Sequence, residues 1–190
     1  MIRETVLTTR SGDGRIHIAP MGVHERPDGL MIAPFRPSAT LDNLLREGFA
    51  AVNCIDDVRV IAGCLTGRRD WPTVPTARVP GARLADALSH LEVVLERVEN
   101  DALRPRLLCR VVREDTHRPF RGFNRAQGAV VEAAILVSRL HMLPRDKIER
   151  ELEYLTIAMD KTAGPREREA WDWLMEKIET FRRRQREACA

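Results

Sequence analysis

The hydrophobic positions in the first half of the chain recur at the short period of β-strands. Ile16 and Ile18 alternate with polar neighbours, and a turn at residues 11–14 joins them to the β-branched run at residues 2–9. These segments predict a β-hairpin. A short helix running to Glu47 is the one helical segment expected in this half. Further strands are expected at residues 30–33, 49–54, 58–65, 91–99 and 107–112.

The second half of the chain changes to the period of amphipathic helices. Apolar residues step by three and four from Ala126 to Leu140, from Ile148 to Met159 and from Trp171 to Ile178. Gly164 and Pro165 separate the last two stripes, as a helix stop and a helix start. The pattern predicts an α+β, mainly β chain, with a barrel or sandwich over residues 1–120 and a helical subdomain of three helices over residues 121–190.

Composition and charge argue against a disordered, a membrane-spanning and a nucleic-acid-binding protein. Hydrophobic residues make up 44% of the 190 residues, which is enough for a folded core, and no apolar run approaches the ~20 residues of a membrane-spanning helix. We therefore expect a soluble, cytoplasmic protein. The 31 basic and 28 acidic residues leave a net charge of only +3, so nucleic acid is not an expected partner. The basic run at residues 182–186 fits a solvated helix end, and a nucleic-acid or partner-binding surface is the alternative.

Familiar catalytic and metal signatures are absent from the sequence. It contains no complete dinucleotide-binding glycine motif, no phosphate-binding P-loop and no serine elbow. The five histidines are scattered, so we expect no metal site. The four cysteines lack zinc-ligand spacing and are expected to be reduced thiols; they are Cys54, Cys64, Cys109 and Cys189.

Three polar segments could bind a ligand. Around residues 34–44, Arg36 precedes a helix that Ser38 or Thr40 can cap, and a guanidinium, hydroxyls and free backbone N–H groups together suit a phosphate. On this local pattern alone, an ordinary capped helix with a surface arginine is favoured. At residues 19–23, a strand end with a proline and a glycine exposes backbone to a flat ligand, or forms a bulge or edge. At residues 120–126, Asn124 can cap the next helix, with Arg125 in its first turn.

The order of these motifs resembles that of flavin reductase-like split barrels. The matching residues are Thr8-Thr9-Arg10, Gly14, Ala19-Pro20-Met21-Gly22-Val23, Ser38-Ala39-Thr40-Leu41-Asp42-Asn43-Leu44 and Gly48-Phe49-Ala50-Ala51-Val52-Asn53. The later runs at residues 123–133 and 138–140 make the sequence more similar still to the family called domain of unknown function 447.

This resemblance implies a split β-barrel of the FMN-binding type that forms a homodimer, holds FMN at the subunit interface and carries a helical C-terminal appendage. The FMN phosphate would then lie among Arg36, Ser38, Thr40 and Asn43. The backbone of Met21, Gly22 and Val23 would face the isoalloxazine, and Arg10, Asn124 and Arg125 would add weaker contacts.

The resemblance favours an FMN-dependent oxidoreductase that acts on an unknown small molecule, with methanopterin-linked one-carbon metabolism as its suggested context. It identifies no catalytic residue, because a bound flavin carries the redox chemistry itself. The alternative is a non-catalytic FMN-binding or assembly protein, since the same fold hosts both kinds of protein.

Overall fold

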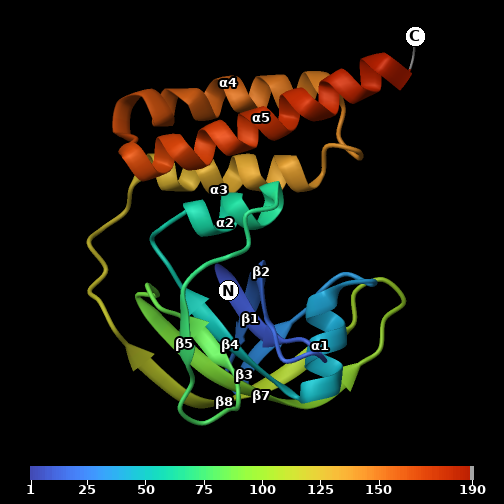
Figure 1. Ribbon diagram of the computed structural model, residues 1–190, viewed down its shortest axis with the longest axis vertical. Coiled ribbons are helices and arrows are strands. Elements are labelled where there is room, and N and C mark those ends of the chain that lie inside the picture. The colour runs from blue at the N-terminus through green and yellow to red at the C-terminus, as the bar shows by residue number, and fades with distance from the viewer. Residues whose placement is uncertain (189–190) are drawn as a thin grey trace. The chain divides into compact units, whose positions relative to one another are not determined.

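The computed structural model of the protein describes residues 1–188, so Cys189 lies outside the described residues. The chain divides into two compact units (Figure 1). The barrel unit contains residues 1–56 and 70–120, and the helical unit contains residues 57–69 and the chain from Arg121 onward. The second unit therefore takes in a segment from the middle of the region that the sequence analysis assigns to the barrel. No helix in the described part of the chain is both long and apolar enough to cross a lipid bilayer.

The barrel unit is a closed antiparallel barrel with the strand order β1-β2-β3-β8-β7-β4. The strands are β1 (Ile2–Arg10), β2 (Ile16–Arg26), β3 (Gly29–Ile32), β4 (Phe49–Cys54), β7 (Ser89–Glu99) and β8 (Arg106–Thr116). The predicted hairpin is present, because Arg10 of β1 pairs with Ile16 of β2 across the turn. A small hairpin of β5 (Thr73–Pro75) and β6 (Ala82–Leu84), absent from the sequence-based expectation, forms a separate sheet.

The barrel core is built by strand alternation and completed by one helix. Leu7, Ile32 and Val93 are buried in one apolar cluster, to which helix α1 (Ala39–Glu47) adds Leu41 and Leu44. Burial of a large aliphatic side chain stabilises the fold by about 1.5–3 kcal/mol. This shared core fixes the start of α1 against the strands.

Strand β3 is short, so it covers only part of the edges of its two neighbours, β2 and β8. The uncovered stretch of β2, residues 19–22, is called the split edge of the barrel. Hydrogen-bonded pairing of β2 with β3 begins only at Val23, so residues 19–22 of β2 pair with β1 alone. In the same way, β3 pairs with β8 only as far as Cys109, and later residues of β8 pair with β7. The uncovered part of β2 lies past Ile32, the C-terminal end of β3, whereas that of β8 lies past Gly29, the opposite end. Each stretch leaves one backbone edge without a strand partner among the described residues.

Residues 58–65 form a helix, and the expected strand there is wrong. Helix α2 (Arg59–Thr66) ends at Gly67, whose φ of 96° lies in the left-handed region that favours glycine. A short apolar run does not distinguish a strand from a buried helix, so contacts far along the chain decide. Here Arg59 pairs with Glu169 at 3.0 Å, and Arg68 lies 4.6 Å over the ring of Trp173. Glu169 and Trp173 both belong to helix α5 (Pro165–Ala188).

The three predicted C-terminal helices are confirmed as α3 (Arg125–Ser138), α4 (Arg145–Thr162) and α5, which lie side by side in Figure 1. Their expected stripes supply buried residues, including Val130 of α3, Ile148 of α4 and Leu174 of α5. The stripes therefore form the core of the helical unit, as amphipathic periodicity predicts.

Candidate functional site

The start of α1 offers backbone donors to an anion. Ser38 is the N-cap, and its Oγ accepts the N–H of Leu41 at 3.3 Å. The amides of Ala39 and Thr40 lie in the first turn, where no carbonyl one turn earlier can accept them. The positive end of the helix dipole adds to these donors, so an anion is favoured here. Asp42, an exposed carboxylate of the same turn, is the one opposing charge on the helix start.

Arg36 stands two residues before this cap, and its side chain is exposed to solvent. Its backbone N–H donates to Leu103 O at 2.9 Å, which holds the approach to the helix in place. Among residues 1–188, no carboxylate forms an ion pair with its guanidinium. An arginine without a carboxylate partner among the described residues therefore precedes the first turn of α1, whose amides have no acceptor within the helix.

Arg104 supports the segment that leads into α1, a role that no sequence motif predicts. Its guanidinium donates to Ala33 O at 2.9 Å and lies 4.4 Å from the centre of the Phe35 ring. The loop that carries it is fixed by Asp101, whose Oδ1 accepts the N–H groups of Leu103 and Arg104. These backbone hydrogen bonds lower the pKa of Asp101. No motif marks such a contact, because it joins segments about seventy residues apart.

Asn43 and Arg10 lie together at α1, but their polar atoms already have partners. The Nδ2 of Asn43 donates to Thr9 Oγ1 at 2.9 Å, and its Oδ1 accepts Arg46 Nη2 at 2.9 Å. Arg10 Nε donates to Glu47 Oε2 at 2.9 Å, and hydrogen bonds from Arg10 and Arg46 lower the pKa of Glu47. These contacts bind α1 to β1. Thr40, the remaining expected phosphate ligand, is buried with only 2% of its surface exposed, so little of this residue is open to a ligand.

Met21, Gly22 and Val23 lie in the middle of β2, whereas the sequence analysis expected a strand end. Pro20 is tolerated there because residues 19–22 form the split edge, where no ladder bond to a second strand is required. Val23 is buried in the barrel core, and Met21 O accepts the hydroxyl of Thr5 at 2.8 Å. A Cβ at Gly22 would lie 3.2 Å from Ile2 Cγ2, so a larger side chain would require the exposed side chain of Ile2 to shift slightly.

Asn124 and Arg125 belong to the helical unit and differ in role. Asn124 is the N-cap of α3: its Oδ1 accepts the N–H groups of Ala126 at 2.8 Å and Gln127 at 3.3 Å. Its Nδ2 donates to Thr162 O at 3.1 Å, which joins α3 to the end of α4. The predicted cap is therefore confirmed. Arg125 is exposed in the first turn of the helix.

A second polar cluster lies at β7 and β8, and the sequence pattern did not predict it. The Nδ1 of His90 lies 3.0 Å from His117 Nε2, and His90 Nε2 lies 3.4 Å from Glu92 Oε1. Burial would raise the pKa of Glu92, but three backbone N–H groups from residues 77–79 lower it below its ordinary value. Burial, together with the charges of Arg83 and His90, lowers the pKa of His117.

Within the described chain, His90, Glu92 and Asp115 are the one group whose ligand atoms are close enough for a shared metal ion, all within 4.8 Å. Both carboxylates already accept hydrogen bonds. Glu92 accepts the three loop amides, and Asp115 accepts Arg113 Nη2 at 3.1 Å. The cluster therefore fits a structural role, in which it fixes the loop at residues 77–79 to the barrel.

Comparison with known proteins gives consistent matches over both units. Models of the N- and C-terminal domains of "Protein of unknown function (DUF447)" match residues 3–118 and 124–176. An uncharacterized protein of Methanocaldococcus jannaschii is 26% identical over 147 residues, which are 74% of this chain and 75% of that protein.

Two solved structures show the same fold. The crystal structure of an FMN-bound DUF447 protein from Methanosarcina mazei is similar, with a TM-score of 0.79, 18% identity and coverage of 93% of this chain and 94% of that chain. A putative flavin reductase from Haemophilus somnus has a TM-score of 0.53, 15% identity and coverage of 62% and 81%. These similarities confirm the expected split barrel of the flavin reductase type.

Proposed function

The chain belongs to the DUF447 family, and from this premise we propose that it binds FMN and uses the flavin as a redox cofactor. The proposal is supported by the FMN bound to the structurally similar Methanosarcina mazei protein and by the flavin reductase-like barrel. The observation that carries it is that Arg36, exposed and without a carboxylate partner among residues 1–188, lies two residues before the N-cap of α1, whose first-turn amides have no acceptor within the helix.

The guanidinium of Arg36 and the donors at the start of α1 fit the phosphate of FMN. A phosphate monoester carries about two negative charges at neutral pH and three strong acceptor oxygens. The guanidinium of Arg36 can donate two parallel hydrogen bonds, and the exposed Ala39 supplies a first-turn amide as a further donor in a fixed position. The hydroxyl of Ser38 accepts Leu41 N–H, which leaves its own proton available for a further oxygen.

The split edge of β2 fits the remaining part of the cofactor. Residues 19–22 present backbone groups on the side that β3 does not cover, and Gly22 allows close approach. When bound, FMN supplies hydride or single-electron transfer through its ring. The contribution of this chain is to hold the ring at the strand edge, orient it and exclude water from one face. The substrate is proposed to be a small molecule that enters opposite this edge.

A homodimer is proposed from the same feature. An uncovered strand edge favours pairing or packing with another chain, and closed two-fold dimers are the commonest soluble assemblies. A second copy would complete the half-built flavin site at the split edge of the barrel. In this proposal FMN lies at the interface between two subunits.

Absorption spectroscopy and a binding titration test the proposed function. The purified protein is expected to show a flavin band or to acquire one with FMN, and to bind riboflavin at least tenfold more weakly, because riboflavin lacks the phosphate. Equal affinity for the two flavins would contradict the phosphate site. If FMN binds but no nicotinamide, deazaflavin or pterin donor reduces it, the non-catalytic alternative replaces the redox proposal.

A further inference from the structure

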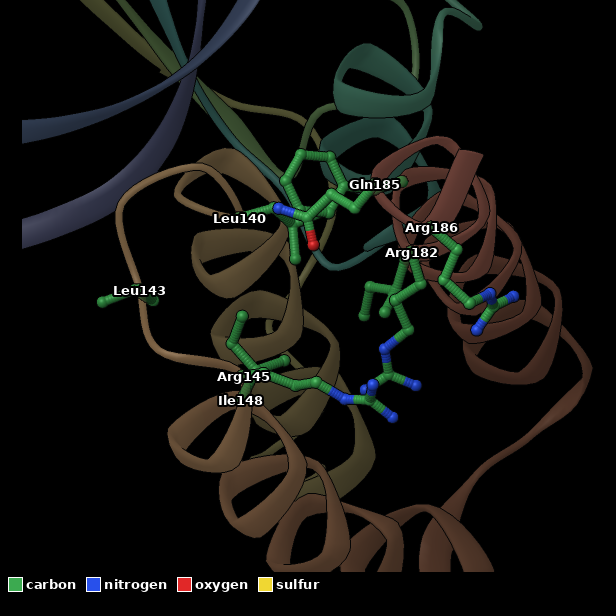
Figure 2. A pocket seen from close by; sticks show the side chains of 9 residues that line it. Leu140, Leu143, Arg145, Ile148, Arg182, Gln185 and Arg186 are labelled. Carbon is green, nitrogen blue, oxygen red and sulfur yellow. The ribbon is translucent and has the colours of Figure 1, made fainter. Parts of the chain in front are cut away.

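The helical unit contains a hollow that the proposed flavin site does not use. Its volume is about 410 Å³, within the ~300–1,000 Å³ typical of small-molecule pockets. It lies where the end of α3, the start of α4 and the last turns of α5 meet (Figure 2). The apolar part of its wall consists of Leu140, Leu143, Ile148, Ile178 and Phe181.

Three arginines line the same hollow: Arg145, Arg182 and Arg186. The first two share one carboxylate, because Arg145 Nε and Arg182 Nη2 lie 2.7 and 3.4 Å from the same oxygen of Glu149. Arg186 Nη2 pairs with Glu179 at 3.0 Å. Three guanidinium groups are thus balanced by two carboxylates, which leaves one positive charge beside an apolar wall.

The start of α4 strengthens this positive character. Its N-cap is Pro144, which has no side chain able to accept a first-turn amide. The positive end of the helix dipole therefore lies at Arg145, a residue of the hollow. The one carboxylate of this first turn, Asp146, is paired with Arg150 at 3.1 Å. The basic run predicted to be a solvated helix end is divided. Arg182, which is half-buried, and Arg186, which is exposed, line the hollow, whereas the exposed Arg183 and Arg184 do not.

We propose that this hollow binds a small organic acid with an apolar body, its anionic group at Arg145 and Arg182 and its body against Leu143 and Ile178. A neutral hydrophobic molecule would leave the excess charge unused, and an inorganic anion would leave the apolar wall uncovered. One oxygen of the Glu149 carboxylate is shared by Arg145 and Arg182. An incoming carboxylate can therefore bind one of these arginines while Glu149 keeps its ion pair with the other. In this proposal the helical unit binds a ligand that is distinct from the flavin.

Isothermal titration calorimetry with two probes of equal shape tests this proposal. The full chain, in the presence of excess FMN to occupy the flavin site, is titrated with 1-naphthoate and with 1-naphthalenemethanol, which has the same rings but no charge. We expect 1-naphthoate to bind at one site per chain and the alcohol to bind at least tenfold more weakly, since charge-assisted hydrogen bonds contribute more than neutral ones.

Three variants localise the binding. Arg182→Gln is expected to weaken 1-naphthoate about 10- to 100-fold while leaving the alcohol unchanged, and Arg183→Gln, the adjacent exposed arginine, to change neither. Leu143→Trp, which fills the hollow, is expected to abolish binding of both probes. Thermal melting establishes that each variant is folded. If Arg182→Gln does not fold, the difference between the two probes and the effect of Leu143→Trp decide.

The proposal is overturned if 1-naphthoate does not bind or if Leu143→Trp leaves its affinity intact. Equal losses in Arg182→Gln and Arg183→Gln would also overturn it, because they would show diffuse attraction to a basic helix end in place of a defined pocket.

Discussion

The carboxylate of Glu92 accepts the backbone N–H of Val79 at 2.8 Å, although the two residues belong to different segments of the barrel unit. Glu92 is fully buried on β7, and its two oxygens also accept the amides of Ala77 and Arg78 at 2.8 and 2.6 Å. A buried charge is tolerated only when it is well bonded. This one carboxylate therefore holds a whole turn of the loop against the strand.

The first prediction concerns that carboxylate. Glu92→Gln replaces one accepting oxygen by an NH₂ group, so at least one loop amide becomes buried without a partner, at a cost of about 1–3 kcal/mol. Urea unfolding is expected to show this loss. Glu96→Gln is the control, because Glu96 lies on the same strand but forms an exposed pair with Arg110. Similar midpoints for Glu92→Gln and wild type would disprove the anchoring role.

The pH dependence of stability gives the second prediction. Because the folded protein holds the pKa of His117 below its ordinary value of 6.5, the unfolded chain takes up this proton first as the pH falls. The free energy of unfolding is therefore expected to decrease below about pH 6.5, until the folded-state pKa is passed. His117→Gln should flatten this decrease in urea titrations between about pH 5 and 7.5. His141→Gln, which removes an exposed imidazole of the helical unit, should leave it in place.

Removal of the exposed guanidinium before α1 gives the third prediction. Arg36→Ala is expected to weaken FMN binding by about 1.5–3 kcal/mol, the range for a hydrogen bond to a charged group, and to leave riboflavin binding unchanged. Fluorescence quenching measures both affinities. Arg106→Ala removes another exposed arginine and serves as the control. An unchanged FMN affinity in Arg36→Ala would remove this arginine from the site.

The fourth prediction separates the cap of α3 from its neighbour. Asn124→Ala loses two capping bonds and the bond to Thr162, so we expect the flavin-free protein to lose about 0.5–2 kcal/mol of stability. Arg125→Ala, with an exposed side chain, should melt like the wild type. If Asn124→Ala instead weakens FMN binding at unchanged stability, Asn124 serves the ligand and not the helix.

The fifth prediction is the oligomeric state. Sedimentation velocity at micromolar concentration is expected to give a dimer, with the same mass with and without reductant. Burial raises the pKa of Cys64 to about 11 and that of Cys109 to about 12, so neither thiol is reactive near neutral pH. A monomer that retains FMN would contradict the proposed interface.

Local patterns predicted the features that depend on neighbouring residues. Asn124 was one of the residues able to cap a helix, and the structure confirms the cap, because the fit of an amide oxygen to first-turn N–H groups is a property of the helix start. The apolar stripes of α3 to α5 were predictable for the same reason, since their period is set within each helix. The likeness to flavin reductase-like barrels came from the order of several such motifs along the chain.

Contacts between distant segments were not predictable. Residues 58–65 form an apolar run that suits a strand and a buried helix equally. Contacts with other helices favour the helix, among them those with Glu169 and Trp173 of α5. Asn43 was expected to face a phosphate, but the structure gives its amide to Thr9 and Arg46. In each case the partner lies on another element, and one sequence without its fold does not show it.

The assignment of α2 to the helical unit constrains how the protein is made and dissected. The ribosome releases residues 1–120 before most of α5 is synthesised, so the apolar residues Val60, Ile61 and Cys64 lack their α5 contacts until α5 has emerged. A fragment that ends at residue 120 would keep α2 without the helices that bury its apolar residues, and we expect this fragment to aggregate. A soluble barrel fragment would therefore require replacement of residues 57–69 by a short polar linker.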